Sequence, residues 1–116
     1  MTPFNGDKLR PRVTARAGGM TFSWPFDTGA SVTCMPANSF NAAFPHDKPL
    51  RVQNGQHCTT ASGNKMNSLG LFEIDLQIIR KTFKHQVNVI DQLTDNIIGI
   101  DFMHRHKLYY DVKLAK

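Results

Sequence analysis

The stretch Phe26-Asp27-Thr28-Gly29-Ala30-Ser31 decides how the rest of this sequence is interpreted. Upstream of Asp27, apolar residues at alternate positions predict a strand with one face in the core; they are Met20, Phe22, Trp24 and Phe26. Thr28 can close a tight turn through its hydroxyl, and Gly29 lacks a Cβ, so another backbone or a substrate can approach closely. The pattern therefore favours a carboxylate presented where a strand ends, although a capped turn would use the same residue types.

Two further motifs sharpen this interpretation. The apolar run Val32-Thr33-Cys34-Met35 follows the acid, and a second element, Asn96-Ile97-Ile98-Gly99, lies far downstream. With these motifs at this spacing, the chain resembles the retropepsins, the aspartic proteases of retroviruses and LTR retrotransposons, over roughly residues 8 to 112.

This resemblance implies a mostly β fold: a retropepsin-like acid-protease half-barrel with a flap hairpin and one short C-terminal helix, paired as a two-fold homodimer. It makes Asp27 the catalytic acid, with Thr28 and Gly29 in the active-site loop. By the same resemblance Ile97 and Ile98 lie beside this loop and help to wall the substrate pockets, but either could equally be plain core. The residues expected at the substrate are Ala30, Ser31, Val32, Cys34, Ala61, Ser62, Gly63, Asn64 and Ile97.

The chain contains a single Asp-Thr-Gly, at Asp27. Hydrolysis of an amide by this route needs two carboxyl groups about 3 Å apart that share one proton. A second copy related by a two-fold axis supplies the missing group. We therefore expect an obligatory homodimer with a coupled Asp27 pair, most active on the acid side of neutrality.

The N-terminal half predicts two hairpins. Residues 11–26 form the first, with Gly18-Gly19 as its turn. Pro25 removes a ladder donor and implies an edge strand or a bulge. A short helix is expected from Pro36 to about Ala43, with Phe40 and Phe44 on one face. Residues 50–52 then form a brief strand, and Asn54-Gly55 is expected to be a second hairpin turn.

The following segment is interpreted as the flap. Its arms are residues 57–60 and 65–79, and its tip is residues 61–64, small and polar as an opening tip requires. The apolar set changes parity near Gly70, which predicts a bulge. An ordinary exposed hairpin would be the interpretation if Asp27 were absent.

The C-terminal part continues the sheet. Arg80-Lys81 is expected to turn into a strand over residues 83–89, followed by a polar loop at 91–95, a helix at 100–106 and a last strand at 107–112. Asp101 could cap that helix or pair with Arg105. Residues 1–10 are interpreted as an N-terminal arm, and residues 11–116 as a single protease domain.

Two positions depart from the better-known viral retropepsins. These commonly carry an acid at the position of Ser31 and an arginine at the position of Ile100, and the two pair to brace the site. Because both partners are missing together, no charge is left unpaired. We expect a weaker dimer, of about micromolar Kd, that is insensitive to salt.

Composition narrows the function classes. With 116 residues, 41% of them hydrophobic, the chain is expected to be one domain with a modest core. Its net charge of +5 comes from basic residues scattered along the chain, so a nucleic-acid partner is a minority interpretation.

Cys34 and Cys58 are interpreted as free thiols in a reducing compartment. No apolar run is long enough for a membrane span. His104 and His106 are two apart on a helix and point apart, so no metal or other cofactor is expected.

The predicted function is therefore a dimeric aspartic endopeptidase of a retroelement or retrovirus, located in the cytoplasm or in virus-like particles, that cleaves polyprotein precursors. A cellular retropepsin-like domain of a shuttle protease is the alternative among enzymes. A dimeric peptide-binding module without turnover is the alternative from another class.

Overall fold

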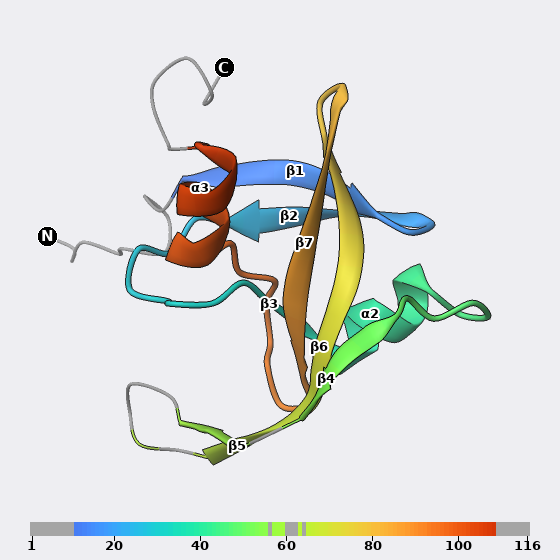
Figure 1. The fold of residues 1–116 in the computed structure, drawn as a ribbon, viewed down its shortest axis with the longest axis vertical. Helices are drawn as coiled ribbons and strands as arrows, with labels where there is room; N and C mark the ends of the chain where they lie inside the picture. The colour runs from blue at the N-terminus through green and yellow to red at the C-terminus, as the bar shows by residue number, and fades with distance from the viewer. Residues whose placement is uncertain (1–10, 56, 60–62, 64, 109–116) are drawn as a thin grey trace, which may run out of the picture.

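The structure, a computed structural model, describes residues 11–55, 57–59, 63 and 65–108. It is mostly β, as predicted, with two short helices among the described residues (Figure 1). The order of strands in the sheet is β2-β1-β6-β7-β3, and β4 and β5 also pair with β6. The elements are β1 (Arg12–Ala17), β2 (Met20–Pro25), β3 (Cys34–Pro36), α2 (Ala37–Ala43), β4 (Arg51–Asn54), β5 (His57–Thr59), β6 (Lys65–Ile78), β7 (Lys81–Ile90) and α3 (Ile100–His106).

The first hairpin forms as the sequence predicts. β1 and β2 pair antiparallel, with Ala17 opposite Met20 at the turn. Gly18 has a φ of 58°, and a Cβ there would lie 2.5 Å from the Ala43 carbonyl oxygen, so both the turn and the approach of α2 require glycine. Pro25 ends β2, which lies at the edge of the sheet, where a missing ladder donor is tolerated.

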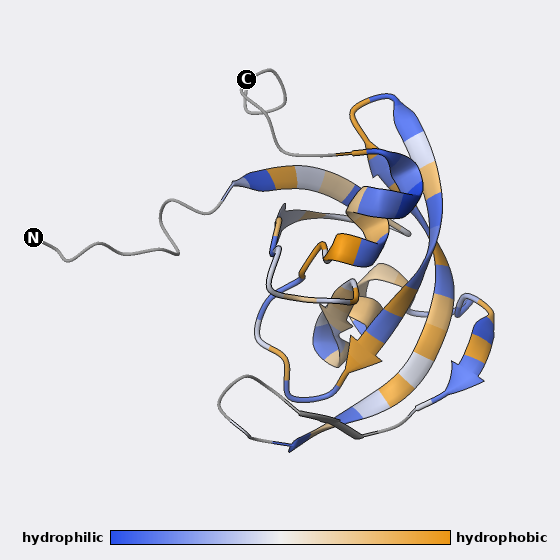
Figure 2. Cartoon of the chain, turned by 60° about the vertical axis from the view of Figure 1, so that its left-hand side comes forward, coloured by the Kyte–Doolittle hydropathy of each residue, from blue (hydrophilic) through white to orange (hydrophobic). Residues whose placement is uncertain are grey.

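The long antiparallel pair of β6 and β7 forms the centre of the molecule (Figure 1). Hydrophobic and hydrophilic residues alternate along β6 (Figure 2), and the apolar ones are buried: Phe72, Ile74, Leu76 and Ile78. The predicted bulge is confirmed, because the β6–β7 register shifts between Ser68 and Gly70, and Gly70 has a φ of 131°.

The expected hairpin turn at Asn54-Gly55 is wrong. β4 and β5 both pair antiparallel with β6, so they run in the same direction and the chain between them does not reverse. A Cβ on Gly55 would lie 1.8 Å from the Ser68 carbonyl oxygen. The glycine is therefore explained by close approach to β6 rather than by a reversing turn.

Smaller differences concern element ends. Pro36 belongs to β3 and is the N-cap of α2, so the helix begins one residue later than expected. The turn between β6 and β7 is at Ile79 and Arg80, with Ile79 at a φ of 59°. The predicted N-terminal arm, most of the flap tip and residues 109–112 of the expected last strand lie outside the described residues.

The core lies between the two hairpins and the two helices. Trp24, Ile98 and Phe102 have no exposed surface, and Phe40 packs against Phe72 with ring centroids 4.6 Å apart. Ile98 belongs to the second motif, so the segment carrying that motif is built directly into the core.

Candidate active site

The Asp27 loop is fixed to the second motif at its start. Phe26 and Ile98 form a parallel bridge. The Asp27 amide donates to the Ile98 carbonyl oxygen at 2.9 Å, and the Ile98 amide donates to the Pro25 carbonyl oxygen at 2.9 Å. These two bonds fix the backbone of the carboxylate residue itself.

The loop is fixed to the same segment at its end. Cys34 and Ile97 exchange two backbone hydrogen bonds of 2.9 Å each, and the Ile100 amide donates to the Ala30 carbonyl oxygen at 2.9 Å. A Cβ on Gly99 would lie 2.6 Å from Val32 carbonyl atoms, so the two segments are in backbone contact. Residues separated widely in sequence thus form one rigid support for the acid.

Within the loop, the carboxylate is held by its own turn. The Gly29 amide donates to Asp27 Oδ1 at 2.9 Å, and the Ala30 amide donates to the Asp27 carbonyl oxygen at 3.1 Å. Asp27 is half-buried, whereas Thr28 and Gly29 are exposed. The arrangement presents an oriented carboxylate at the surface, where it can act as a proton donor or acceptor.

Comparisons with known proteins agree with this geometry. The family profile described as retroviral aspartyl protease matches residues 7–110. This chain belongs to that family. It is an aspartic endopeptidase of the retroviral type.

Among solved structures, the protein resembles the EIAV protease complexed with the inhibitor HBY-793, at a TM-score of 0.71 and 16% identity. The match covers 89% of this chain and 93% of the EIAV chain, and it confirms the predicted retropepsin-like fold. A comparison with curated proteins gave no match. Within its described part, this family member has no helix long and apolar enough to cross a membrane.

The residues expected at the substrate of this retroviral-type protease differ in how exposed they are. Ser31 and Val32 are exposed and Ala30 is half-buried, all beside Asp27 in the loop. Cys34 is buried, and its thiol donates to the Val32 carbonyl oxygen at 3.4 Å. Of the flap-tip residues, Gly63 is exposed, and Ala61, Ser62 and Asn64 lie outside the described residues.

The two isoleucines of the second motif differ in burial. Ile98 is completely buried, whereas Ile97 is half-buried. The core alternative therefore applies to Ile98, and Ile97 keeps a surface that a substrate could contact.

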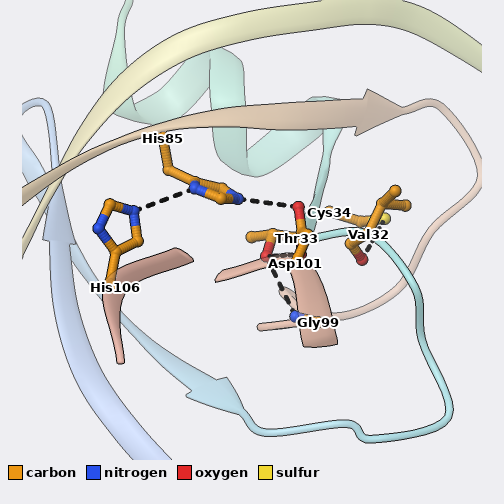
Figure 3. Close-up of polar contacts among 7 residues, drawn as sticks. All are labelled: Val32, Thr33, Cys34, His85, Gly99, Asp101 and His106. Carbon is orange, nitrogen blue, oxygen red and sulfur yellow. Dashed lines mark hydrogen bonds and ion pairs between the residues drawn. The ribbon is translucent and has the colours of Figure 1, made fainter. Parts of the chain in front are cut away.

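A polar network that the sequence did not predict lies behind the loop of this protease (Figure 3). The Gly99 amide donates to Thr33 Oγ1 at 3.1 Å, and this hydroxyl donates to Asp101 Oδ1 at 2.8 Å. Asp101 Oδ2 lies 2.8 Å from His85 Nε2, and His85 Nδ1 lies 3.1 Å from His106 Nε2. The alternation of residues along β7 could have indicated this network from the sequence. His85 lies two residues from both Phe83 and Val87 and therefore shares their inward face of the strand.

Both roles expected for Asp101 are wrong. Gly99 is the N-cap of α3 without a side-chain cap bond, and Asp101 binds Thr33 and His85 instead of Arg105. Burial alone would raise the pKa of Asp101, but the hydrogen bonds from His85 and Thr33 outweigh it and hold this pKa below its ordinary value of 3.8.

The ring of His106 contacts the ring of His85, with 3.1 Å between His106 Nε2 and His85 Nδ1. Burial first, and then the positive charges of His85 and Arg105, lower the pKa of His106 below its ordinary value of 6.5. Among the described residues, no group of three or more histidine, cysteine, aspartate or glutamate side chains could hold a metal ion.

Proposed function

We propose that this protease is a homodimer that cleaves polyprotein precursors of a retrovirus or LTR retrotransposon, with Asp27 of each protomer forming the catalytic pair. The observation that supports it best is the single Asp-Thr-Gly per chain, held by the second motif at the protein surface. One carboxylate can orient water or donate a proton but cannot do both at once. A two-fold axis beside Asp27 would supply the second group.

The environment of Asp27 is consistent with a partner at this surface. Thr28 and Ser31 are exposed next to it, and Val32 is 40% exposed although it is apolar. In the proposed dimer, Thr28 bonds across the axis and Gly29 presents its backbone to the substrate. An exposed valine beside a reactive carboxylate also suits a pocket for an apolar side chain.

The proposed substrate is an extended peptide with apolar residues flanking the cleaved bond. Such a peptide would pair by backbone hydrogen bonds as an added strand, with alternate side chains in pockets at Ala30, Val32 and Ile97. The segment from β5 to the start of β6 would close over it as a flap. Residues 11–116 would form this protease domain, acting in the cytoplasm or in virus-like particles.

The dimer is proposed to lack the charged brace of better-known viral members. Ser31 is exposed, and Ile100 is half-buried with its amide bonded to the Ala30 carbonyl oxygen. Without charges at these positions, added salt has little to screen. Sedimentation at several salt concentrations should give a similar dimer constant; steep dissociation on adding salt would contradict this.

A subunit-mixing experiment tests the shared site. Wild-type protein and Asp27→Asn are mixed in different ratios at a constant total protomer concentration until the subunits exchange, and cleavage of a pool of library peptides is then measured below pH 7. If the dyad is shared, activity falls with the square of the wild-type fraction, to about a quarter at equal amounts.

The control is Asp47→Asn, which removes an exposed carboxylate in the loop after α2. Mixing with this variant should leave activity unchanged. A linear fall with Asp27→Asn, or full activity of that variant alone, would refute the dyad. Peptide binding without cleavage at any pH would instead support the binding-module alternative.

A further inference from the structure

A network of polar groups that take no direct part in the proposed chemistry connects the active-site loop with α3 and β7. It runs from Gly99 through Thr33 to Asp101 on α3, then to His85 on β7 and back to His106 on α3 (Figure 3). Thr33 is completely buried and His85 is 6% exposed. Polar groups buried to this extent are costly unless all are paired, so the network needs a defined set of proton positions.

The network acts on the catalytic loop through backbone contacts. Thr33 closes the loop that begins at Asp27, and its hydroxyl holds the amide of Gly99. Gly99 directly follows Ile98, whose carbonyl oxygen accepts the Asp27 amide. Loss of the Asp101 partner would free the Thr33 hydroxyl to rotate away from Gly99. The orientation of Asp27 would then be less well fixed.

We propose that Asp101 and His85 are positioning residues for the loop that carries Asp27, and that His106 limits the pH range over which they hold it. This inference rests on the function proposed above, because it concerns the efficiency of the same site.

The geometry allows one extra proton and resists a second. With neither ring charged, His85 donates from Nε2 to Asp101 and accepts at Nδ1 from His106. With one proton added, His85 donates from both nitrogens, and His106 accepts after its own hydrogen moves to Nδ1. Every bond survives, and the His85–Asp101 contact becomes an ion pair.

A second proton cannot be accommodated in the same way. With both rings charged, two N–H groups would face each other across the 3.1 Å between His85 Nδ1 and His106 Nε2. The other charges facing His106 are Arg105 on α3 and Lys81 on β7, which oppose its protonation, and Asp101, which favours it. The lowered pKa of His106 agrees with this conflict.

Protons can reach the network from solvent. A pocket of about 330 Å³ opens between the loop and α3, and it is lined by Val32, Leu71, His85, Gln86, Asp101 and Arg105. The singly protonated network can therefore form by exchange of a proton with solvent at His85 and Asp101, which line this pocket.

The kinetic test compares pH profiles of kcat and KM for four proteins. Asp101→Asn removes the charge but keeps two hydrogen-bonding atoms, and kcat should fall about tenfold with KM within about twofold. His106→Gln still pairs with either form of His85 but cannot take the second proton, so the acid limit of kcat should move down by about one pH unit. His46→Gln, at an exposed loop histidine, should match the wild type.

A second measurement does not depend on turnover or on the stability of the Asp101 variant. In the Asp27→Asn protein, NMR should show His85 and His106 taking up one shared proton, and the Gly99 amide shift should follow that titration. The Gly99 amide shift should not follow the ring signals of His46.

The outcomes separate the two proposals. An inactive wild type that still shows the linked Gly99 titration would refute the proposed function but not the coupling. An active wild type whose pH profile is unchanged in both Asp101→Asn and His106→Gln, or a Gly99 amide that ignores the histidines, would overturn the positioning role.

Discussion

Replacing Gly99 with alanine tests the contact between the second motif and the loop that carries Asp27. An alanine Cβ would lie 2.6 Å from both the carbonyl carbon and the oxygen of Val32, and 2.9 Å from the Ala30 carbonyl oxygen. All three are backbone atoms, so no side chain can rotate away. Gly99 has a φ of −91°, which alanine adopts readily, and the effect is therefore purely one of space.

Relief to an ordinary contact of 3.4 Å requires a movement of 0.8 Å between the two segments. Overpacking of this kind costs about 1–3 kcal/mol of unfolding free energy. Because a misplacement of about 1 Å at a catalytic group can cost about 100-fold, kcat should fall by roughly that factor.

Urea unfolding at fixed protomer concentration and steady-state kinetics measure the two effects of Gly99→Ala. Gly19→Ala is the control, because its Cβ would lie 3.7 Å from the Ala43 carbonyl oxygen, in ordinary contact. Unchanged stability together with kcat within about twofold of wild type would refute the reasoning.

Three further predictions follow from the same region. Ile98→Ala should cost about 2–5 kcal/mol in urea unfolding because the side chain is fully buried, whereas Ile97→Ala should cost less and change KM more; equal stability losses would contradict this division. Thr33→Val leaves the buried Gly99 amide unpaired and should cost about 1–3 kcal/mol, with recovery in Thr33→Ser; a variant as stable as wild type would argue against the bond. Because the pKa of His106 is lowered on folding, stability present above pH 6.5 should decline as the pH falls below it, and His106→Gln should flatten that decline in pH-dependent thermal melts; identical slopes would exclude it.

Local patterns were sufficient for the main elements. Alternation in β6 and β7 reported burial directly, and Gly18-Gly19 identified the first turn, because each signal depends only on neighbours in sequence. Near Gly70 the apolar residues change from one set of alternate positions to the other. This change predicted the bulge, where the register shifts by a single residue.

Interactions between distant segments could not be predicted in this way. A glycine beside an asparagine is typical of a turn, whereas the constraint on Gly55 is its close approach to the backbone of Ser68. The sequence around Asp101 offers partners only on its own helix, but its bonds go to Thr33 and His85 outside that helix. The candidate site was found from Asp27, and its supporting network was not, because nothing local in the sequence reveals which buried polar groups meet.

The hydrogen bonds that hold the loop have a consequence for biosynthesis. The Gly99–Thr33 bond spans 66 residues of sequence, and the Thr33–Asp101 bond spans 68. Asp27 and Thr33 are synthesised early in translation, whereas Gly99 and Asp101, which hold the loop, are synthesised only near the end of this domain. Contacts of such long range also form slowly during folding. A chain that ends before Gly99 cannot form either bond, so we expect the loop that carries Asp27 to become ordered only after nearly the whole domain has been made.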